Sequence, residues 1–304
     1  MVPQLKNMNI FYINLKDSLD RKQHFIKFEK NIQRFPAVNA KKYSDNEEFL
    51  KKISLMTQSK IFFNSRNTNE EINTIGAIGC SLSHYFLWCS FLNDKIHDDY
   101  LNYVDSDEKE EVKKLSFKKN NSIDDEYLFV LEDDASFDYN NDLDTVQKEL
   151  HGIINNIGDN WDIYLVDSLQ KRDDEDFITK ENFSIVNSSN FISNTRCKEK
   201  YCKVLSFFGT HSYIIKKSAI KKIIEYFYPI ECHIDAYLGL LAQKKIINIV
   251  GTKNKILTNR LVYSTINHSL IFNNFFFSIM LTIMIILIII IVVLLVIITN
   301  RKKV

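Results

Sequence analysis

A buried strand that ends in three carboxylates is the feature that most limits how this chain can fold. Residues 127–134 read Tyr-Leu-Phe-Val-Leu-Glu-Asp-Asp, so a largely apolar run stops abruptly at Glu132, Asp133 and Asp134. Ligands of open α/β sheets bind at the carboxyl ends of the strands, and carboxylate oxygens suit Mg²⁺ or Mn²⁺. The stretch predicts an α/β fold with a divalent metal site at a strand end. The alternative is a strand followed by an acidic turn, because Asp favours turns.

The second strong feature is an apolar run near the C-terminus. Residues 275–298 carry no charge, and only Ser278 and Thr282 interrupt the apolar side chains. At about 1.5 Å per residue a helix of this length spans a bilayer. A buried helix of a soluble protein is the alternative, but every face of this helix would be apolar. We expect a single transmembrane anchor over residues 271–299, followed by a basic tail at 300–304.

The orientation of this anchor is less constrained. We find no signal sequence ahead of the domain, so tail insertion that leaves the domain in the cytosol is slightly favoured over a lumenal domain. The basic flank at residues 301–303 argues the other way, because positive residues prefer the cytosolic side. Glycosylation sequons at Asn182 and Asn187 would also suit a lumenal domain.

Composition excludes several classes of function. Residues 1–270 suffice for one large α/β domain or two small ones. The formal net charge is +1, which provides no general basic field for nucleic acid. The chain has only seven Gly and lacks both the G-x-G-x-x-G and the P-loop patterns. A Rossmann dinucleotide site and a P-loop are therefore disfavoured.

The five cysteines match neither a disulfide scaffold nor a zinc motif, because their number is odd and their spacing irregular. Cys80 and Cys89 lie in an apolar stretch and are expected to be small buried hydrophobes. Cys197 and Cys202 lie close together in a polar segment, where they could pair in an oxidising compartment.

Hydrophobic periodicity predicts alternating strands and helices, which is typical of a doubly wound sheet. Residues 41–73 show no clear long element, residues 93–125 read as a charged, solvated insertion with room for a short helix, and residues 170–200 are polar and irregular. The expected strands are 9–15, 35–40, 127–131, 161–166, 203–208, 209–215 (after a turn) and 246–250. The expected helices are 21–32, 80–92, 142–157, 218–228 (capped by Ser218) and one that begins at 234.

Several landmarks together resemble glycosyltransferase family 25, which includes lipopolysaccharide and procollagen galactosyltransferases. They are Ile13-Asn14-Leu15 with Asp20-Arg21, Gly76-Ala-Ile-Gly79-Cys80-Ser-Leu-Ser83-His84, Val130-Leu131-Glu132-Asp133-Asp134, Trp161-Asp162-Ile163, Gly209-Thr210-His211-Ser212-Tyr213 and Ile234-Asp235. The resemblance covers roughly residues 9–250. It implies a GT-A fold with a mixed sheet, a nucleotide-sugar donor (typically UDP-galactose), inversion at the anomeric carbon and Mn²⁺ (or Mg²⁺). The acceptor would be a hydroxyl of a glycan, a lipid-linked sugar or a hydroxylysine-type protein.

The resemblance also suggests roles for single residues. Glu132 and Asp134 bracket Asp133 as in a DxD motif; Asp134 is the leading metal ligand, with Asp133 and His211 as further candidates. An inverting transfer needs a base, for which Asp235 is the family-matched candidate and Asp167 the competitor. The donor-binding candidates are Asn14, Arg21, Gly79, Ser83, His84, Glu132 and Asp133.

Alternatives remain open at this stage. Arg21 could be a surface residue of a first helical turn, and His84 could be a hydrogen-bonded core histidine. A catalytically inactive, membrane-anchored binding or scaffold protein on a transferase fold is the main alternative function. A phosphohydrolase is disfavoured because the chain lacks the extra His and Asp clusters of two-metal sites. The 93–125 and 170–200 insertions and the anchor depart from the family pattern.

Overall fold

The computed structural model describes residues 8–26, 32–65, 67–68, 70–117, 126–137, 143–167, 201–252 and 257–259. The chain divides into two compact units, Met1–Val262 and Tyr263–Val304. The second unit, with the expected anchor and basic tail, lies outside the described residues, as do Cys197 and the expected 170–200 insertion. Within the described residues, helix α4 (Ile75–Leu92) is long and apolar enough to cross a membrane, but 72% of it is buried inside the protein.

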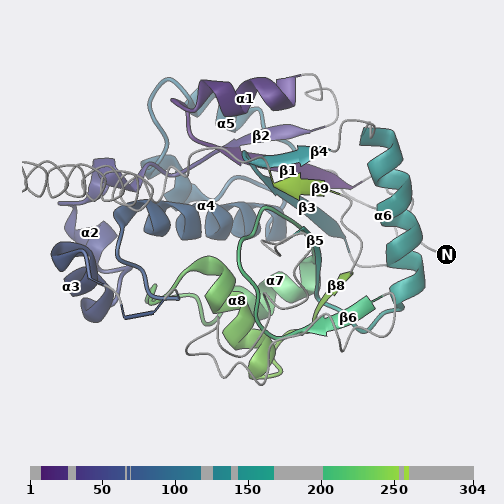
Figure 1. The fold of residues 1–304 in the computed structure, drawn as a ribbon. Helices are drawn as coiled ribbons and strands as arrows, with labels where there is room; N and C mark the ends of the chain where they lie inside the picture. The colour runs from purple at the N-terminus through teal and green to yellow at the C-terminus, as the bar shows by residue number, and fades with distance from the viewer. Residues whose placement is uncertain are drawn as a thin grey trace, which may run out of the picture. The chain divides into compact units, whose positions relative to one another are not determined.

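A seven-stranded mixed sheet forms the centre of the first unit, in the order β2-β1-β3-β7-β5-β8-β6 (Figure 1). Strands β1, β2 and β3 are parallel to one another, and β5 is parallel to β8. Strand β7 runs antiparallel between β3 and β5, and β6 runs antiparallel to β8. The strands are β1 (Asn9–Asn14), β2 (Gln33–Pro36), β3 (Tyr127–Glu132), β5 (Ile163–Asp167), β6 (Tyr201–Val204), β7 (Ser212–Lys216) and β8 (Ile249–Thr252). The expectation of a mixed α/β fold is confirmed.

Helices cover both faces of this sheet. Helices α1 (Leu19–Ile26) and α6 (Leu143–Ile157) pack on one face, where Tyr12 stacks on Phe25 with ring centroids 4.5 Å apart. Helix α4 lies against the other face, next to α7 (Lys217–Ile224), and its Trp88 meets Tyr213 of β7 edge to face. Because strand side chains alternate between faces, each buried strand supplies both cores.

The structure corrects the expectation for residues 41–73. A 3₁₀ turn η2 (Ala40–Tyr43) and helices α2 (Glu47–Leu50) and α3 (Leu55–Phe63) lie here. The N-cap of α3 is Ser54, whose hydroxyl accepts a hydrogen bond from the backbone N–H of Thr57 at 3.2 Å. The buried contacts of α3 involve polar side chains, while Leu55 and Phe62 are 83% and 82% exposed. The usual pattern of an amphipathic helix is therefore reversed.

The 93–125 segment is less solvated than expected. Over residues 93–117 it forms a 3₁₀ turn η3 (Asp98–Asn102) and a short helix α5 (Lys109–Lys113), and the short helix was anticipated. However, Tyr100 and Val112 are fully buried, and Tyr100 stacks on Phe35 of β2. This part of the insertion belongs to the core.

The remaining differences concern boundaries and one small sheet. Strand β2 ends at Pro36. Strand β6 begins two residues and ends four residues before the predicted strand, and β8 is displaced by two to three residues. Helix α7 begins at Lys217, so Ser218 is not its N-cap. The strands β4 (Ala135–Phe137) and β9 (Leu257–Asn259) pair antiparallel and were not predicted. Helix α8 (Ile234–Gln243) begins at the expected residue.

Candidate functional site

The ends of several strands meet at one edge of the sheet. In the parallel pair β1 and β3, Ile13 lies opposite Glu132, so both strands end together. Strand β7 runs the other way and therefore begins there, with its Ser212 opposite both Leu131 of β3 and Asp167 of β5. The backbone N–H of Glu132 donates to the carbonyl of His211 at 2.8 Å. This topology brings the acidic cluster next to the loop that precedes β7.

Glu132, Asp134 and His211 form a group of possible metal ligands. One ligand atom from each lies within 4.8 Å of the others. His211 Nδ1 is 3.1 Å from Asp134 Oδ1 and 3.8 Å from Glu132 Oε2. Two carboxylates and one imidazole, gathered at the carboxyl end of a strand, make an oxygen-rich donor set that fits Mn²⁺ or Mg²⁺.

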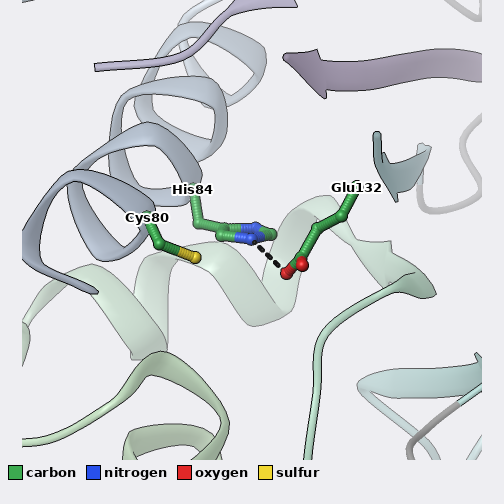
Figure 2. A group of neighbouring side chains, drawn as sticks. All are labelled: Cys80, His84 and Glu132. Carbon is green, nitrogen blue, oxygen red and sulfur yellow. Dashed lines mark hydrogen bonds and ion pairs between the residues drawn. The ribbon is translucent and has the colours of Figure 1, made fainter. Parts of the chain in front are cut away.

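A buried hydrogen-bond chain orients His84 toward Glu132, and Figure 2 shows its last link, between His84 and Glu132. Trp88 Nε1, which can only donate, donates to the hydroxyl of Tyr213 at 2.9 Å. The Tyr213 hydroxyl lies 2.8 Å from His84 Nδ1, and burial holds its pKa well above the usual value, so it keeps a proton to donate. His84 Nε2 lies 3.2 Å from Glu132 Oε1, and because a carboxylate oxygen can only accept, this nitrogen is the donor. His84 is thus a buried, hydrogen-bonded histidine that contacts the acidic cluster, and its donor-binding role stays a prediction.

The carboxyl of Glu132 is held in its ionised form. Burial acts to raise its pKa, but the hydrogen bond from His84 and the nearby charges of His211 and His84 act in the opposite direction. The Thr210 hydroxyl also donates a hydrogen bond to Oε1. Together these interactions lower the pKa of Glu132 to about 2. Glu132 is therefore a carboxylate at neutral pH, with Oε2 turned toward His211.

Asp133 lies apart from this group. Its Oδ2 accepts from Asn14 Nδ2 at 2.9 Å, and its Oδ1 forms an ion pair with Arg21 NH1 at 2.5 Å. Burial raises the pKa of Asp133, although Arg21 and Asn14 act to lower it. Asn14 is in turn held by Arg34, whose Nε donates to its side-chain oxygen at 3.1 Å. The sequence-predicted residues Asn14, Arg21 and Asp133 thus form one connected cluster beside the possible metal ligands.

Gly79 and Ser83 position helix α4, which carries His84, against the segment after β2. A Cβ on Gly79 would lie 2.5 Å from the carbonyl oxygen of Val38, so the helix approaches this backbone more closely than any larger residue allows. The Ser83 hydroxyl accepts from the N–H of Val38 at 2.8 Å and donates to the Gly79 carbonyl at 2.6 Å. Ser83 is fully buried. Both residues therefore fix α4 to the segment after β2, which differs from the direct donor contact expected from the sequence.

Asp235 fixes the loop that carries His211. Its Oδ2 accepts from the N–H of Gly209 and its Oδ1 from the N–H of Ala236, both at 2.7 Å. Gly209 has φ +79°, and a Cβ there would lie 2.5 Å from His211 Nε2. Asp167 ends β5 at the same sheet edge, but its side chain lies outside the described residues.

Some site residues were missed by the sequence analysis. Cys80 was expected to be a buried hydrophobe, yet it is half-buried with its thiol beside His84 and Glu132; Cys89 is buried as predicted. The spacing of Cys80 and His84, four residues apart, places both on one face of a helix and could have revealed the pair. Thr210 and Arg34 gave no comparable signal, because their contacts depend on residues far away in the sequence.

Comparison with protein-family models gives one match. The model described as glycosyltransferase family 25 (LPS biosynthesis protein) matches residues 7–101 and 114–238. A search of curated proteins gave no match. The matched segments cover most of the chain and contain β1, the acidic cluster, the Gly79–His84 part of α4, the loop before β7 and Asp235. The chain therefore belongs to glycosyltransferase family 25.

Proposed function

We propose that the protein is a metal-dependent, inverting glycosyltransferase of GT-A type that moves a hexose, galactose, from a UDP-sugar to a hydroxyl acceptor. The acceptor would be a glycan, a lipid-linked sugar or a hydroxylysine-type protein. The observation that carries this proposal is the grouping of Glu132, Asp134 and His211 at the sheet edge of a family 25 chain.

Glu132, Asp134 and His211 would hold Mn²⁺ (or Mg²⁺). When bound, the ion would neutralise charge on the diphosphate leaving group. Hydrogen bonds fix the orientation of Glu132 before an ion binds. His84 and Thr210 donate to Oε1, and Oε2 is directed toward His211. Such preorganisation means that the ligands need little rearrangement on binding.

The cluster of Asn14, Arg21 and Asp133 would face the nucleotide part of the donor. Asn14 and Arg21 lie at and beyond the end of β1, and Asp133 lies just beyond the end of β3; nucleotides bind at such strand ends in open α/β sheets. Arg21 is 2.5 Å from Asp133, so in this structure it buries and orients that carboxylate. We assign Arg21 to a donor phosphate as well, because a guanidinium has five donors and can serve a carboxylate and a phosphate together.

Asp235 would act as the general base. Each of its oxygens accepts one backbone N–H, which leaves lone pairs that can take a proton from the acceptor. The acceptor oxygen would attack the anomeric carbon while the bond from that carbon to the diphosphate oxygen breaks. The hydroxyl proton would pass to Asp235, and the configuration would invert in a single displacement. Asp167, at the end of β5, is the alternative base.

Residues 271–299 would anchor the domain as a single C-terminal span, with a slight preference for a cytosolic domain. The charge-free composition of residues 275–298 supports this assignment. Protease treatment of sealed membranes tests the orientation, because a cytosolic domain is digested without detergent and a lumenal domain is protected. Removal of residues 271–304 should release the domain from membranes; a truncated protein that stays in the membrane fraction would contradict the anchor.

UDP release from a panel of UDP-sugars, with and without Mn²⁺, tests the proposed activity. We expect UDP release from UDP-galactose that requires the metal and is abolished by a chelator. Asp134→Ala should abolish it and leave the circular dichroism spectrum unchanged, whereas Asp45→Ala, an exposed acid outside the site, should have no effect. Full activity of Asp134→Ala would eliminate the metal role. A folded wild-type protein that releases UDP from no donor would favour the inactive binding or scaffold alternative.

A further inference from the structure

A second set of possible metal ligands lies on the α4 side of Glu132. Cys80, His84 and Glu132 offer a thiol, an imidazole and a carboxylate, and one ligand atom from each lies within 4.8 Å of the others. Figure 2 shows Cys80 and His84 projecting from the same helix toward the end of the Glu132 side chain. Only Glu132 belongs also to the group with Asp134 and His211.

The separation of His84 and Glu132 fits that of two ligands in a tetrahedral site. Nitrogen and oxygen ligands about 2.0 Å from a tetrahedral Zn²⁺ lie about 3.3 Å from each other. The observed separation between His84 Nε2 and Glu132 Oε1 is 3.2 Å. The Cys80 sulfur lies within 4.8 Å of a ligand atom of each residue, and a zinc–sulfur bond of about 2.3 Å would bring it to about 3.5 Å from them. Three protein ligands leave the fourth position to water.

The ligand atoms of Cys80, His84 and Glu132 differ in chemistry from those of the group formed by Glu132, Asp134 and His211. Sulfur and imidazole ligands select borderline-soft ions such as Zn²⁺, whereas carboxylate-rich sets suit Mn²⁺ and Mg²⁺. Burial and the nearby carboxylates of Glu132, Asp235, Asp134 and Asp133 raise the pKa of the Cys80 thiol. The same negative charges attract a divalent cation, and a thiol that coordinates such a cation loses its proton to solvent.

We propose that Cys80, His84 and Glu132 form a site for Zn²⁺ that is distinct from the donor-metal site. Coordination through His84 Nε2 requires the ring hydrogen to move to Nδ1. The Tyr213 oxygen, 2.8 Å away and held by Trp88, would then accept that hydrogen. Outer partners of this kind fix the orientation of histidine ligands in metal sites. The ring keeps its position while its tautomer changes, and the Tyr213 hydroxyl hydrogen turns away from Nδ1.

Occupation of this site would compete with the donor metal through the shared carboxylate. Glu132 Oε1 faces His84 at 3.2 Å and Oε2 faces His211 at 3.8 Å, so the two candidate sites use opposite oxygens of one group. A Zn²⁺ ion bound to Glu132 offsets the negative charge of this carboxylate, so Glu132 attracts a second cation nearby less strongly. Zn²⁺ should therefore inhibit a transfer that Mn²⁺ supports. The zinc site itself needs no nucleotide and does not depend on the proposed transferase activity.

Cobalt spectroscopy tests the site directly. Co²⁺ replaces Zn²⁺ in such sites, and a cobalt–thiolate bond adds a charge-transfer band in the near ultraviolet. The purified full-length protein, freed of metals with a chelator, is titrated with Co²⁺ and then with Zn²⁺. We expect the band to appear in the wild type and to disappear when Zn²⁺ displaces Co²⁺.

Variants locate the ligands. Cys80→Ser should abolish the band, and the matched control Cys232→Ser, which alters another half-buried thiol, should keep it. Asp134→Ala should also keep it, which separates this site from the donor-metal site. Circular dichroism checks folding, and Cys80→Ala replaces Cys80→Ser if the latter unfolds. No band in the folded wild type, or an unchanged band in a folded Cys80 variant, would overturn the proposal.

Discussion

Replacement of Arg34 by methionine should destabilise the domain strongly. The Arg34 side chain is only 6% exposed and pairs with Glu108 at 2.7 Å, which is 7% exposed. Its guanidinium also donates to the side chain and the backbone carbonyl of Asn14, both at 3.1 Å. Methionine fills similar space but leaves the Glu108 carboxylate buried without a charged partner. Loss of one member of a buried ion pair costs about 3–5 kcal/mol of folding free energy.

Glu111 provides a matched control in the same network. It pairs with the same guanidinium at 3.0 Å, but its side chain is 41% exposed. Glu111→Gln should therefore cost no more than about 1 kcal/mol, as for other solvent-exposed pairs. The two variants test whether burial, and not the number of ion pairs, determines the stability contributed by the 98–113 segment.

Urea unfolding measures both variants. The chain has two tryptophans, Trp88 and Trp161, and both are buried in the described domain, so their fluorescence reports its unfolding. A lower midpoint with an unchanged slope gives the loss of stability. Domains of this kind have a free energy of unfolding of about 5–15 kcal/mol, so the variant should still fold and the loss can be measured. A cost below about 1 kcal/mol for Arg34→Met, or equal costs for both variants, would refute the reasoning.

Further predictions concern the candidate bases and the loop before β7. Asp235→Asn should lower turnover about 10²-fold or more with donor affinity little changed, as expected for loss of a general base; if steady-state kinetics show this pattern for Asp167→Asn instead, Asp167 is the base. Gly209→Ala should weaken Mn²⁺-dependent UDP release, because its Cβ would lie 2.5 Å from His211 Nε2 at a backbone with φ +79°. Gly152→Ala in α6, where a Cβ meets no atom within 4 Å, should leave UDP release unchanged, and equal losses in both glycine variants would contradict the steric argument.

Local sequence sufficed to predict β1 and β3, the two buried strands that lead to the site. The apolar runs before Asn14 and Glu132 predicted β1 and β3, and the polar residues at their ends marked the site edge. Parallel strands of a doubly wound sheet end at the same edge, so the proximity of these residues followed from the predicted fold class. The resemblance to family 25 added the loop before β7, which no local pattern connects to β3.

Elements whose partners are remote in sequence could not be predicted in this way. Helix α3 exposes Leu55 and Phe62 and uses polar side chains for its contacts, so hydrophobic periodicity gave no inward face to recognise. The 98–113 segment looked solvated because it is rich in charge, yet Glu108 is neutralised by Arg34 of β2. In both cases a contact with a residue remote in sequence determines whether a side chain is buried, although its sequence neighbours predict exposure to solvent.

The three acidic residues have different partners because the strand ends within the triplet. Glu132 is the last residue of β3, and Asp133 and Asp134 form the turn that follows it. Glu132 and Asp134 thus share His211, while Asp133 turns to Asn14 and Arg21. Because β7 runs antiparallel, its first residues can approach Glu132 from one side while His84 of α4 approaches from the other. The Glu132 carboxylate, at the end of β3, therefore contacts side chains from both α4 and the loop before β7. A displacement of any of these three elements should alter the position of Glu132 and with it the candidate metal site.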